Sequence, residues 1–332
     1  MIRSMVATVL ALLLILQLGN TAAAQSLLER LFGGRGVKPL TQAQERALKP
    51  KDTFQECDAC PEMVVVPSGQ FMMGSSEDEV RRFATEGLQV SSIAANESPK
   101  HVVTFTQPFA VGKLEVTVDQ FSAFVEKTGH GPLDSCGLGP PLGIPSKERN
   151  FRSPGFPQTG KHPVVCVSWQ DAKAYVAWLS RETGKRYRLL TEAEWEYVAR
   201  ARSTTAFWWG NEIEKNRENC GECGTAWSGK QSAPVGSLAP NPWGLHDTLG
   251  NVTEWVEDCG KEGYVGAPTD GSARIPAIIM GQPTFACNVR QTRGGSSSSP
   301  PWRMRSGSRD NLLGPNDSLE NLGFRVARTI GP

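Results

Sequence analysis

The chain lacks an excess of charge of either sign. Its 332 residues include 35 lysines and arginines against 34 aspartates and glutamates, which gives a net charge of +1. Nonspecific binding to nucleic acid needs a marked basic excess or a basic stripe. The composition therefore argues against a nucleic-acid partner.

Long hydrophobic runs are missing after the N-terminus. The run Met5–Leu18 is too short to cross a bilayer comfortably, and no later segment is apolar enough for a membrane helix. Arg3 before this run and the small residues 22–24 after it are typical of a secretory signal peptide. We therefore expect residues 1–24 to be a cleaved signal, and the mature chain to begin near Gln25 in the periplasm or outside the cell.

Histidine is scarce, with four residues at positions 101, 130, 162 and 246. A serine or cysteine nucleophile needs a base within hydrogen-bond reach, and none of these histidines lies in a recognisable triad context. The sequence therefore gives no support for a serine hydrolase. A three-histidine metal site assembled from distant loops stays open as an alternative.

Cysteine is plentiful, with eight residues: Cys57, Cys60, Cys136, Cys166, Cys220, Cys223, Cys259 and Cys287. An even number in an exported protein favours disulfides, and we predict sequential pairing: 57–60, 136–166, 220–223 and 259–287. The two Cys-x-x-Cys pairs also allow a four-thiolate zinc site or a redox-active pair. An oxidising compartment and the wide separation of the two pairs disfavour zinc.

The remaining composition predicts one domain with a sizeable core, since 39% of the residues are hydrophobic and nine are tryptophans. Residues 25–56 are polar and are expected to form a linker or a weak N-terminal helix. The domain is expected to span residues 57–330. Strand patterns occur at 63–67, 69–74, 101–105 and 109–111.

Capping boxes predict three helices, because a Ser or Thr is followed three residues later by Gln, Asp or Glu. These helices begin at Thr117, Ser168 and Thr191. Trp178 and Trp195 lie at helical spacing and are expected in the core. After residue 203 the periodicity fades into Gly-, Pro- and Asn-rich sequence, which predicts ordered loops held by disulfides or bound cations.

A series of motifs then appears in one order along the chain. They are Phe71-Met72-Met73-Gly74-Ser75, Glu97-Ser98-Pro99-Lys100-His101, Glu115-Val116-Thr117, Pro163-Val164-Val165-Cys166-Val167-Ser168-Trp169, Arg188-Leu189-Leu190-Thr191-Glu192-Ala193-Glu194-Trp195-Glu196, Asn241-Pro242-Trp243-Gly244-Leu245, Gly250-Asn251-Val252-Thr253-Glu254-Trp255, Arg293-Gly294-Gly295-Ser296 and Gly323-Phe324-Arg325. Together they resemble the formylglycine-generating enzyme (sulfatase-modifying factor) superfamily over nearly the whole mature domain. The resemblance implies an α+β fold, mixed α/β with little regular secondary structure and related to C-type lectins.

The best-known chemistry of that superfamily depends on two cysteines after the Gly-Gly-Ser turn, which bind copper and oxidise a cysteine on a sulfatase. Cu(I) prefers sulfur ligands, yet Ser299 and Pro301 stand at the corresponding positions here, and no cysteine lies between Ser296 and Arg305. The resemblance therefore implies the family cleft without its copper site. The cleft candidates are Ser296, Ser299, Trp302, Arg305 and Arg309.

Four arginines near the chain's end allow two interpretations. They are Arg293, Arg305, Arg309 and Arg325. As guanidinium forks they could clamp an anionic ligand. Alternatively they pair with acids such as Glu194, Glu196 and Asp317 to tie loops together, which is the role we favour.

One loop resembles a family calcium site. Asp247 and Glu254 offer carboxylates, and Gly250 and Val252 offer the backbone carbonyls that the family uses; oxygen ligands suit Ca²⁺. We expect structural calcium here, with a local Asx turn and a capping glutamate as the alternative.

The superfamily includes formylglycine generators, the sulfoxide-forming domain of ergothioneine synthases, pyoverdine-maturation proteins and lectin-like binding modules. Fold membership does not decide among them. We expect an exported, monomeric factor that oxidatively modifies a protein or peptide, with the catalytic metal unassigned. The alternative is a noncatalytic lectin-like binding or scaffold module.

Overall fold

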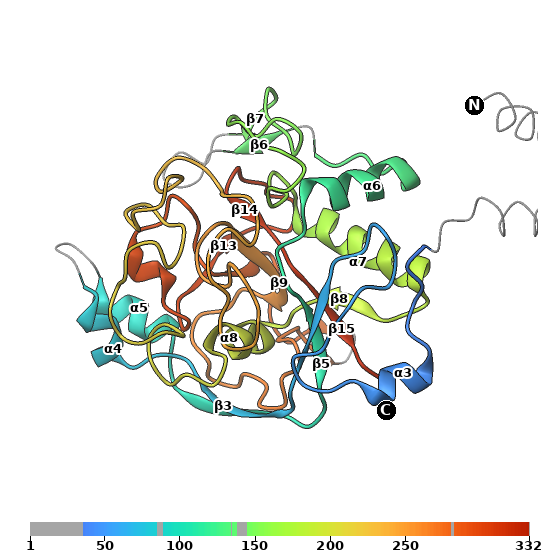
Figure 1. Ribbon diagram of the computed structural model, residues 1–332. Coiled ribbons are helices and arrows are strands. Elements are labelled where there is room, and N and C mark those ends of the chain that lie inside the picture. The colour runs from blue at the N-terminus through green and yellow to red at the C-terminus, as the bar shows by residue number, and fades with distance from the viewer. Residues whose placement is uncertain (1–35, 85–88, 134, 138–144, 280–281, 332) are drawn as a thin grey trace, which may run out of the picture. The chain divides into compact units, whose positions relative to one another are not determined.

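The computed structural model describes residues 36–84, 89–133, 135–137, 145–279 and 282–331 (Figure 1). The expected signal peptide lies outside these residues. Residues Pro39–Pro332 form one compact unit. Residues 39–56, which are expected from the sequence to form a linker or a weak helix, belong to this unit.

The first helix of the unit, α3 (Gln42–Ala47), explains that early start. Thr41 and Gln44 close a capping box at its N-terminus. Glu45 on this helix forms ion pairs with Lys185 and Arg328, two residues far away in the sequence. Buried charge pairing thus fastens α3 to the end of the chain, which lies beside it in Figure 1.

Two larger sheets form the β-structure. The five-stranded sheet has the order β1-β2-β5-β15-β8, with every neighbouring pair antiparallel. Its strands are β1 (Thr53–Phe54), β2 (Met63–Val66), β5 (Phe109–Gly112), β15 (Val326–Thr329) and β8 (Tyr187–Leu189). The strand nearest the C-terminus therefore lies inside the sheet rather than at its edge.

The second sheet has the order β13-β12-β9-β14. Its strands are β13 (Arg309–Leu313), β12 (Arg290–Arg293), β9 (Thr253–Cys259) and β14 (Leu322–Gly323). Three two-stranded pairs complete the β-structure: β3 (Gly69–Met73) with β4 (His101–Phe105), β6 (Cys136–Gly137) with β7 (Pro145–Ser146), and β10 (Ile278–Ile279) with β11 (Gln282–Pro283).

The three helices predicted from capping boxes are all present, and each box is closed by hydrogen bonds. They are α6 (Val118–Thr128), α7 (Trp169–Thr183) and α8 (Glu192–Arg200). Glycines 129 and 184 end the first two helices in the left-handed conformation, which glycine adopts without steric cost. Two short helices, α4 (Glu77–Arg82) and α5 (Val90–Asn96), and a 3₁₀ turn, η1 (Pro301–Met304), were not predicted.

The long segment between α8 and β9 contains turns and no named helix or strand. This agrees with the loss of periodicity after residue 203. The mixture of helices, short strands and long loops is the expected α+β fold. Within the described residues, no helix has both the length and the hydropathy needed to cross a membrane.

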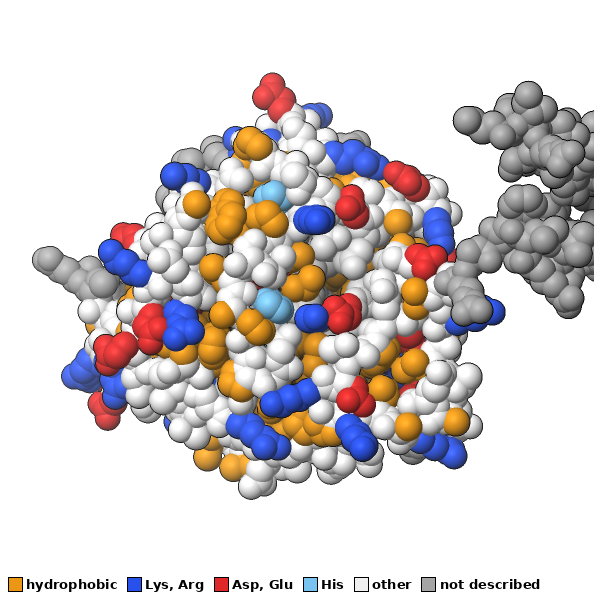
Figure 2. Space-filling model, in the orientation of Figure 1, with side chains coloured by type: hydrophobic (Ala, Val, Ile, Leu, Met, Phe, Trp, Pro, Cys, Tyr) orange, Lys and Arg blue, Asp and Glu red, His pale blue; other side chains and the backbone are white. Residues whose placement is uncertain are grey.

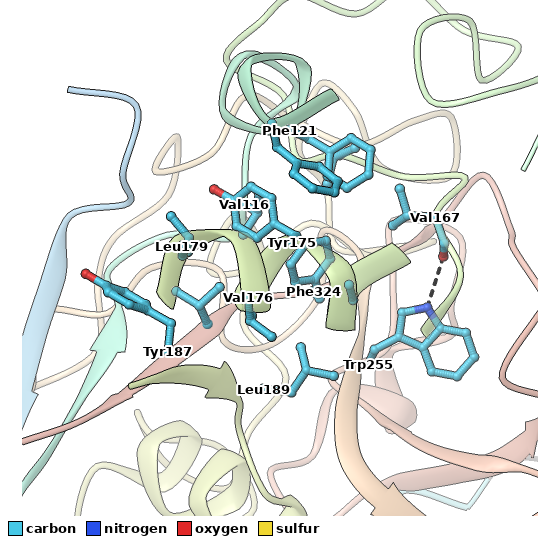
Figure 3. Packing of buried hydrophobic residues seen from close by; sticks show 14 of the residues in the cluster. Val116, Phe121, Val167, Tyr175, Val176, Leu179, Tyr187, Leu189, Trp255 and Phe324 are labelled. Atoms are coloured by element: carbon cyan, nitrogen blue, oxygen red, sulfur yellow. Dashed lines mark hydrogen bonds between the residues drawn. The ribbon is translucent and has the colours of Figure 1, made fainter. Parts of the chain in front are cut away.

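The core has two clusters of buried side chains. In the first, Phe121 of α6, Tyr175 of α7 and Phe324 pack in aromatic contacts (Figure 3). Trp255 lies at the edge of that cluster and donates a hydrogen bond from Nε1 to the carbonyl of Val167, 3.0 Å away. The second cluster surrounds α8 and includes Trp195, which is 1% exposed.

Four disulfides connect the eight cysteines in the sequential pairing expected from the sequence: Cys57–Cys60, Cys136–Cys166, Cys220–Cys223 and Cys259–Cys287. No cysteine is left free, so the thiolates required by the zinc hypothesis are absent from this state. Acidic and basic side chains are interspersed on the face in Figure 2, in keeping with the balanced composition.

Candidate functional site

A pocket of about 380 Å³ opens beside the second sheet. Its walls come from β12 and the Gly-Gly-Ser turn after it, from η1, from β13, and from the segment that leads into β14. The lining residues are 253, 292–295, 298–300, 302–303, 308–310, 313, 319 and 321–322. The family motif at Arg293-Gly294-Gly295 therefore forms part of a real cavity.

Residues 296–299, here called the serine loop, form one wall region of this pocket. The backbone N–H of Ser296 donates to Oγ of Ser299 at 3.0 Å, and Asn321 Nδ2 donates to Oγ of both Ser296 and Ser298 at 3.1 Å. The loop is thus fixed by hydrogen bonds. Ser298 and Ser299 line the pocket, whereas Ser296 lies behind them.

Histidine is not among the pocket-lining residues. The ionisable side chains there are Arg293, Arg303, Arg309 and Asp310. A hydroxyl nucleophile at Ser299 would need a nearby base, and none of these cationic or ion-paired groups supplies one. The serine loop therefore serves here as a hydrogen-bonding surface.

Arg305 does not line the pocket, which corrects its place among the cleft candidates. Its guanidinium is fully buried and donates two bonds of 2.7 Å to the carboxylate of Glu97, a fork-to-fork arrangement. This pair joins the end of α5 to the segment after η1. Trp302 and Arg309, in contrast, do line the pocket.

The other arginines also form internal ion pairs. Arg309 donates two bonds of 2.8 Å to Glu192, and Arg293 approaches Glu196 at 2.6 Å. Burial alone would lower the pKa of Arg293, but Tyr264, Glu196 and Glu192 together raise it. These contacts agree with the role favoured from the sequence, in which the arginines pair with acidic residues and tie segments of the chain together.

The expected acidic partners are only partly right. Glu196 does pair with Arg293. Glu194 instead pairs with Arg188, and Asp317 accepts a backbone hydrogen bond from Gly314. The Arg188–Glu194 pair joins β8 to α8, and the Arg293–Glu196 pair joins β12 to α8, so these partners depend on how the elements pack.

The sequence did not single out Arg303 and Asp310, which place an ion pair of 2.7 Å in the pocket wall. Their side chains are 37% and 27% exposed, so water and a ligand can reach them. In the sequence, only their position next to Trp302 and Arg309 connects these two residues with the cleft. They give the pocket a polar edge opposite apolar residues such as Leu313 and Leu319.

The loop from Asp247 to Glu254 brings two carboxyl groups into the interior. Glu115, Asp247 and Glu254 are buried around a single guanidinium, Arg325. Burial, and then the charges of Asp247 and Glu254, raise the pKa of Glu115 well above its ordinary value. Burial likewise raises the pKa of Asp247.

Among the expected calcium ligands, the carboxylate of Glu254 accepts the most hydrogen bonds. It accepts hydrogen bonds from Nε of Arg325 at 2.8 Å and from Nε1 of Trp195 at 2.8 Å. A carboxylate offers about four lone-pair positions, so ligation by Glu254 would be shared with these donors. Asp247 accepts a hydrogen bond from Gly236, and Glu115 accepts hydrogen bonds from Asn251 and Val252. Carboxyl oxygens of this kind are the ligand type that a hard divalent cation prefers.

A further cluster lies under the serine loop. Carboxylate and sulfur atoms of Glu218, Cys220 and Cys223 all lie within 4.8 Å of one another, a grouping of metal-ligand types that is unique within the described part of the chain. The two cysteines are bonded to each other. The sequence signal that was overlooked is an acid two positions before a Cys-x-x-Cys pair.

Comparison with known proteins agrees with this geometry. Residues 49–330 match the family model of the sulfatase-modifying factor enzyme 1-like domain. The chain is 33% identical over 307 residues to the formylglycine-generating enzyme of Streptomyces coelicolor, covering 80% of this chain and 88% of that one.

Two other similarities are informative. The inactive Cα-formylglycine-generating enzyme 2 of Mus musculus is 30% identical over 324 residues, covering 82% of this chain and 87% of its own length. The solved structure of PvdO from Pseudomonas aeruginosa superposes with a TM-score of 0.70 at 38% identity, covering 85% of this chain and 99% of that one. The chain belongs to the sulfatase-modifying factor (formylglycine-generating enzyme) family.

Proposed function

We propose that the protein is an exported maturation factor that binds a protein or peptide segment in the pocket and modifies it oxidatively. The pocket carries this proposal. Its volume of about 380 Å³ lies in the usual range for ligand sites. It combines apolar walls, serine hydroxyls and an exposed ion pair, which suits a peptide side chain with its adjoining backbone.

The proposal does not include formylglycine formation by copper. Two thiolates would be needed in the cleft, but the corresponding wall is the serine loop, and all eight cysteines lie in disulfides. These facts support a modification whose catalytic group differs from a copper bis-thiolate. The four disulfides also support the periplasm or the cell exterior as the place of action.

The second candidate is a noncatalytic binding module. The similarity to the inactive mouse relative favours it, as does a pocket whose ionisable residues are ion-paired. In this case the same cleft would hold a peptide without changing it.

One experiment separates these candidates. The purified full-length mature protein would be incubated with a peptide digest of exported proteins, and bound and released peptides compared by mass spectrometry, alongside metal analysis. A recurrent loss of two hydrogens or gain of one oxygen on bound peptides supports the maturation factor. Retention of unmodified peptides, with calcium as the only stoichiometric metal, supports the binding module.

A pocket variant makes the readout specific. Asn321→Ala removes both donors to the serine loop, and Trp302→Ala removes an aromatic wall; each is expected to weaken peptide retention. Glu126→Gln is the matched control because this exposed carboxyl on α6 lies outside the pocket lining. Equal retention by all three variants would refute the pocket as the binding site.

We also propose that the loop from Asp247 to Glu254 holds a structural Ca²⁺, with the side chains of Asp247 and Glu254 and the carbonyls of Gly250 and Val252 as ligands. The three buried carboxyl groups around Arg325 support it. The cation would neutralise charge and fix this loop, with no part in the chemistry.

Chelation tests this cation directly. A ligand present at a hundred times its Kd stabilises the folded state by about 2.7 kcal/mol, so EGTA is expected to lower the Tm and excess Ca²⁺ to restore it. Asp247→Asn should abolish the response while the exposed control Glu126→Gln retains it. An unchanged Tm in wild-type protein, together with no bound calcium by metal analysis, would exclude the site.

A further inference from the structure

The disulfide Cys220–Cys223 lies beside a buried acid that has no hydrogen-bond donor. Glu218 is 1% exposed, its Oε1 lies 3.5 Å from Sγ of Cys223, and its Oε2 has no hydrogen-bond partner among the described residues. A buried polar group left unsatisfied costs about 1–3 kcal/mol. Such a group calls for a functional explanation.

The chemistry of the pair supplies one. Neither sulfur of a disulfide carries a hydrogen, so any proton between Glu218 and Cys223 must reside on the carboxyl. Burial raises the pKa of Glu218 well above its ordinary value, which keeps that proton in place. A protonated carboxyl in contact with a disulfide sulfur can protonate it when the S–S bond breaks.

The Cys-x-x-Cys segment and the turn that follows it touch the serine loop through backbone atoms. The N–H of Gly221 donates to the carbonyl of Ser299 at 2.8 Å, and the N–H of Gly229 donates to that of Ser297 at 2.9 Å. A Cβ at Gly221 would lie 3.0 Å from the Ser299 oxygen. Any change in this disulfide is therefore passed directly to a wall of the pocket.

We propose that Cys220–Cys223 is a redox-active disulfide that oxidises a dithiol partner, with Glu218 as the acid for the departing sulfur. The partner's thiolate attacks Sγ of Cys220 and forms a mixed disulfide. The S–S electron pair goes to Sγ of Cys223, which takes the proton of Glu218.

The partner's second thiolate then displaces Cys220, which takes up a proton. The partner loses two electrons and two protons and becomes a disulfide. The protein gains two electrons and two protons, because its disulfide becomes two thiols. Glu218 then recovers its proton from water. This activity goes beyond the proposed peptide modification and does not depend on it.

The chain contains a matched internal control. Cys57–Cys60 has the same spacing, and Cys57 is more exposed than Cys220 or Cys223. The acid beside it, Glu56, is fully engaged by Arg328 and Tyr187. Accessibility alone therefore predicts that Cys57–Cys60 exchanges first, whereas the proposal predicts the reverse order.

The test uses the folded mature protein in buffers of reduced and oxidised dithiothreitol. Free thiols are trapped by alkylation at successive times and assigned by peptide mass spectrometry, with near-UV circular dichroism to confirm that the protein stays folded. We expect Cys220–Cys223 to open first and Glu218→Gln to slow that opening by about a hundredfold. The rate at Cys57–Cys60 should stay unchanged in this variant.

Opening of Cys57–Cys60 first, with Cys220–Cys223 protected until the protein unfolds, would overturn the proposal. So would an unchanged rate in a folded Glu218→Gln variant. If that variant fails to fold, the order of opening in wild-type protein decides by itself, and Glu218→Asp, which retains the carboxyl, serves as the second variant.

Discussion

Single buried charges hold the loops around the pocket. Arg305 is the clearest case, because Glu97 depends on it for both of its charge-assisted bonds. Arg305→Ala leaves that carboxylate buried without a cation and is expected to cost about 3–5 kcal/mol in the free energy of unfolding. Urea denaturation measures the loss.

The control for this change is Arg303→Ala. Arg303 also has an acidic partner, Asp310, but both side chains are partly exposed, and exposed pairs contribute about 0–1 kcal/mol. A similar loss in both variants would show that burial is not what makes the Arg305–Glu97 pair stabilising.

Asp258 should make stability depend on pH. Burial, followed by the charge of Glu192, raises its pKa from 3.8 to about 7 in the folded protein. The folded state therefore binds this proton more tightly than the unfolded chain does. Its contribution to stability is present at low pH and is lost as the pH rises from about 4 to about 7, by at most about 1.4 kcal/mol per pH unit.

Asp258→Asn tests this sign because an amide does not titrate. The free energy of unfolding, measured at several pH values between 4 and 8, should fall less steeply in the variant than in the wild type. Parallel curves would assign the pH dependence to other groups. Asp258 also accepts backbone hydrogen bonds from Glu192 and Arg274, so its replacement lowers stability at every pH. Comparing the slopes of the two stability curves against pH removes this constant difference.

At the scale of elements, the serine loop and the Cys-x-x-Cys loop are packed too closely for a side chain at Gly221. Gly221→Ala brings Cβ to 3.0 Å from the Ser299 carbonyl and 3.2 Å from that of Ser298. We expect a loss of about 1–3 kcal/mol, typical of overpacking, and faster amide exchange at residues 298–299.

Gly131→Ala is the control for that prediction. No described atom lies within 4 Å of a Cβ at Gly131, and its backbone is not among the positive-φ glycines. It should leave both stability and exchange in the serine loop unchanged. Equal effects of the two substitutions would contradict a specific contact between the loops.

Elements with local signals were predictable. The capping boxes at Thr117, Ser168 and Thr191 predict α6, α7 and α8 because each box is complete within four residues. Thr41 and Gln44 carry the same signal, and α3 lies within the segment expected to be a linker or a weak N-terminal helix. Local chemistry thus accounts for most of the helices.

Features made by distant residues were not predictable. Arg305 and Glu97 are 208 positions apart, and nothing near either residue indicates the other. The position of Glu218 two residues before Cys220 is visible in the sequence, but its burial and the lack of a hydrogen-bond partner for its Oε2 among the described residues arise only in the fold. The family motifs located the pocket but could not distinguish a lining residue such as Arg309 from a buried tie such as Arg305.

At the scale of the whole molecule, disulfides of different loop length should stabilise to different degrees. Cys136–Cys166 spans 30 residues, and Cys57–Cys60 spans three. The chain-entropy relation gives about 3.6 kcal/mol for the long loop and about 1.6 kcal/mol for the short one.

Replacing each pair by serines tests this difference through the free energy of unfolding. Removal of Cys136–Cys166 should be the more damaging change, since it frees a long segment of the unfolded chain. Losses of the same size would indicate that strain or packing at each bond outweighs chain entropy.

The central position of β15 has a consequence for how the protein is made. β15 separates β5 from β8, and Arg328 on it pairs with Glu45 and Glu56 near the start of the domain. The sheet cannot close until the ribosome has released its last strand, and contacts of such long sequence separation slow folding. The five-stranded sheet is therefore completed late in folding, after β15 has left the ribosome.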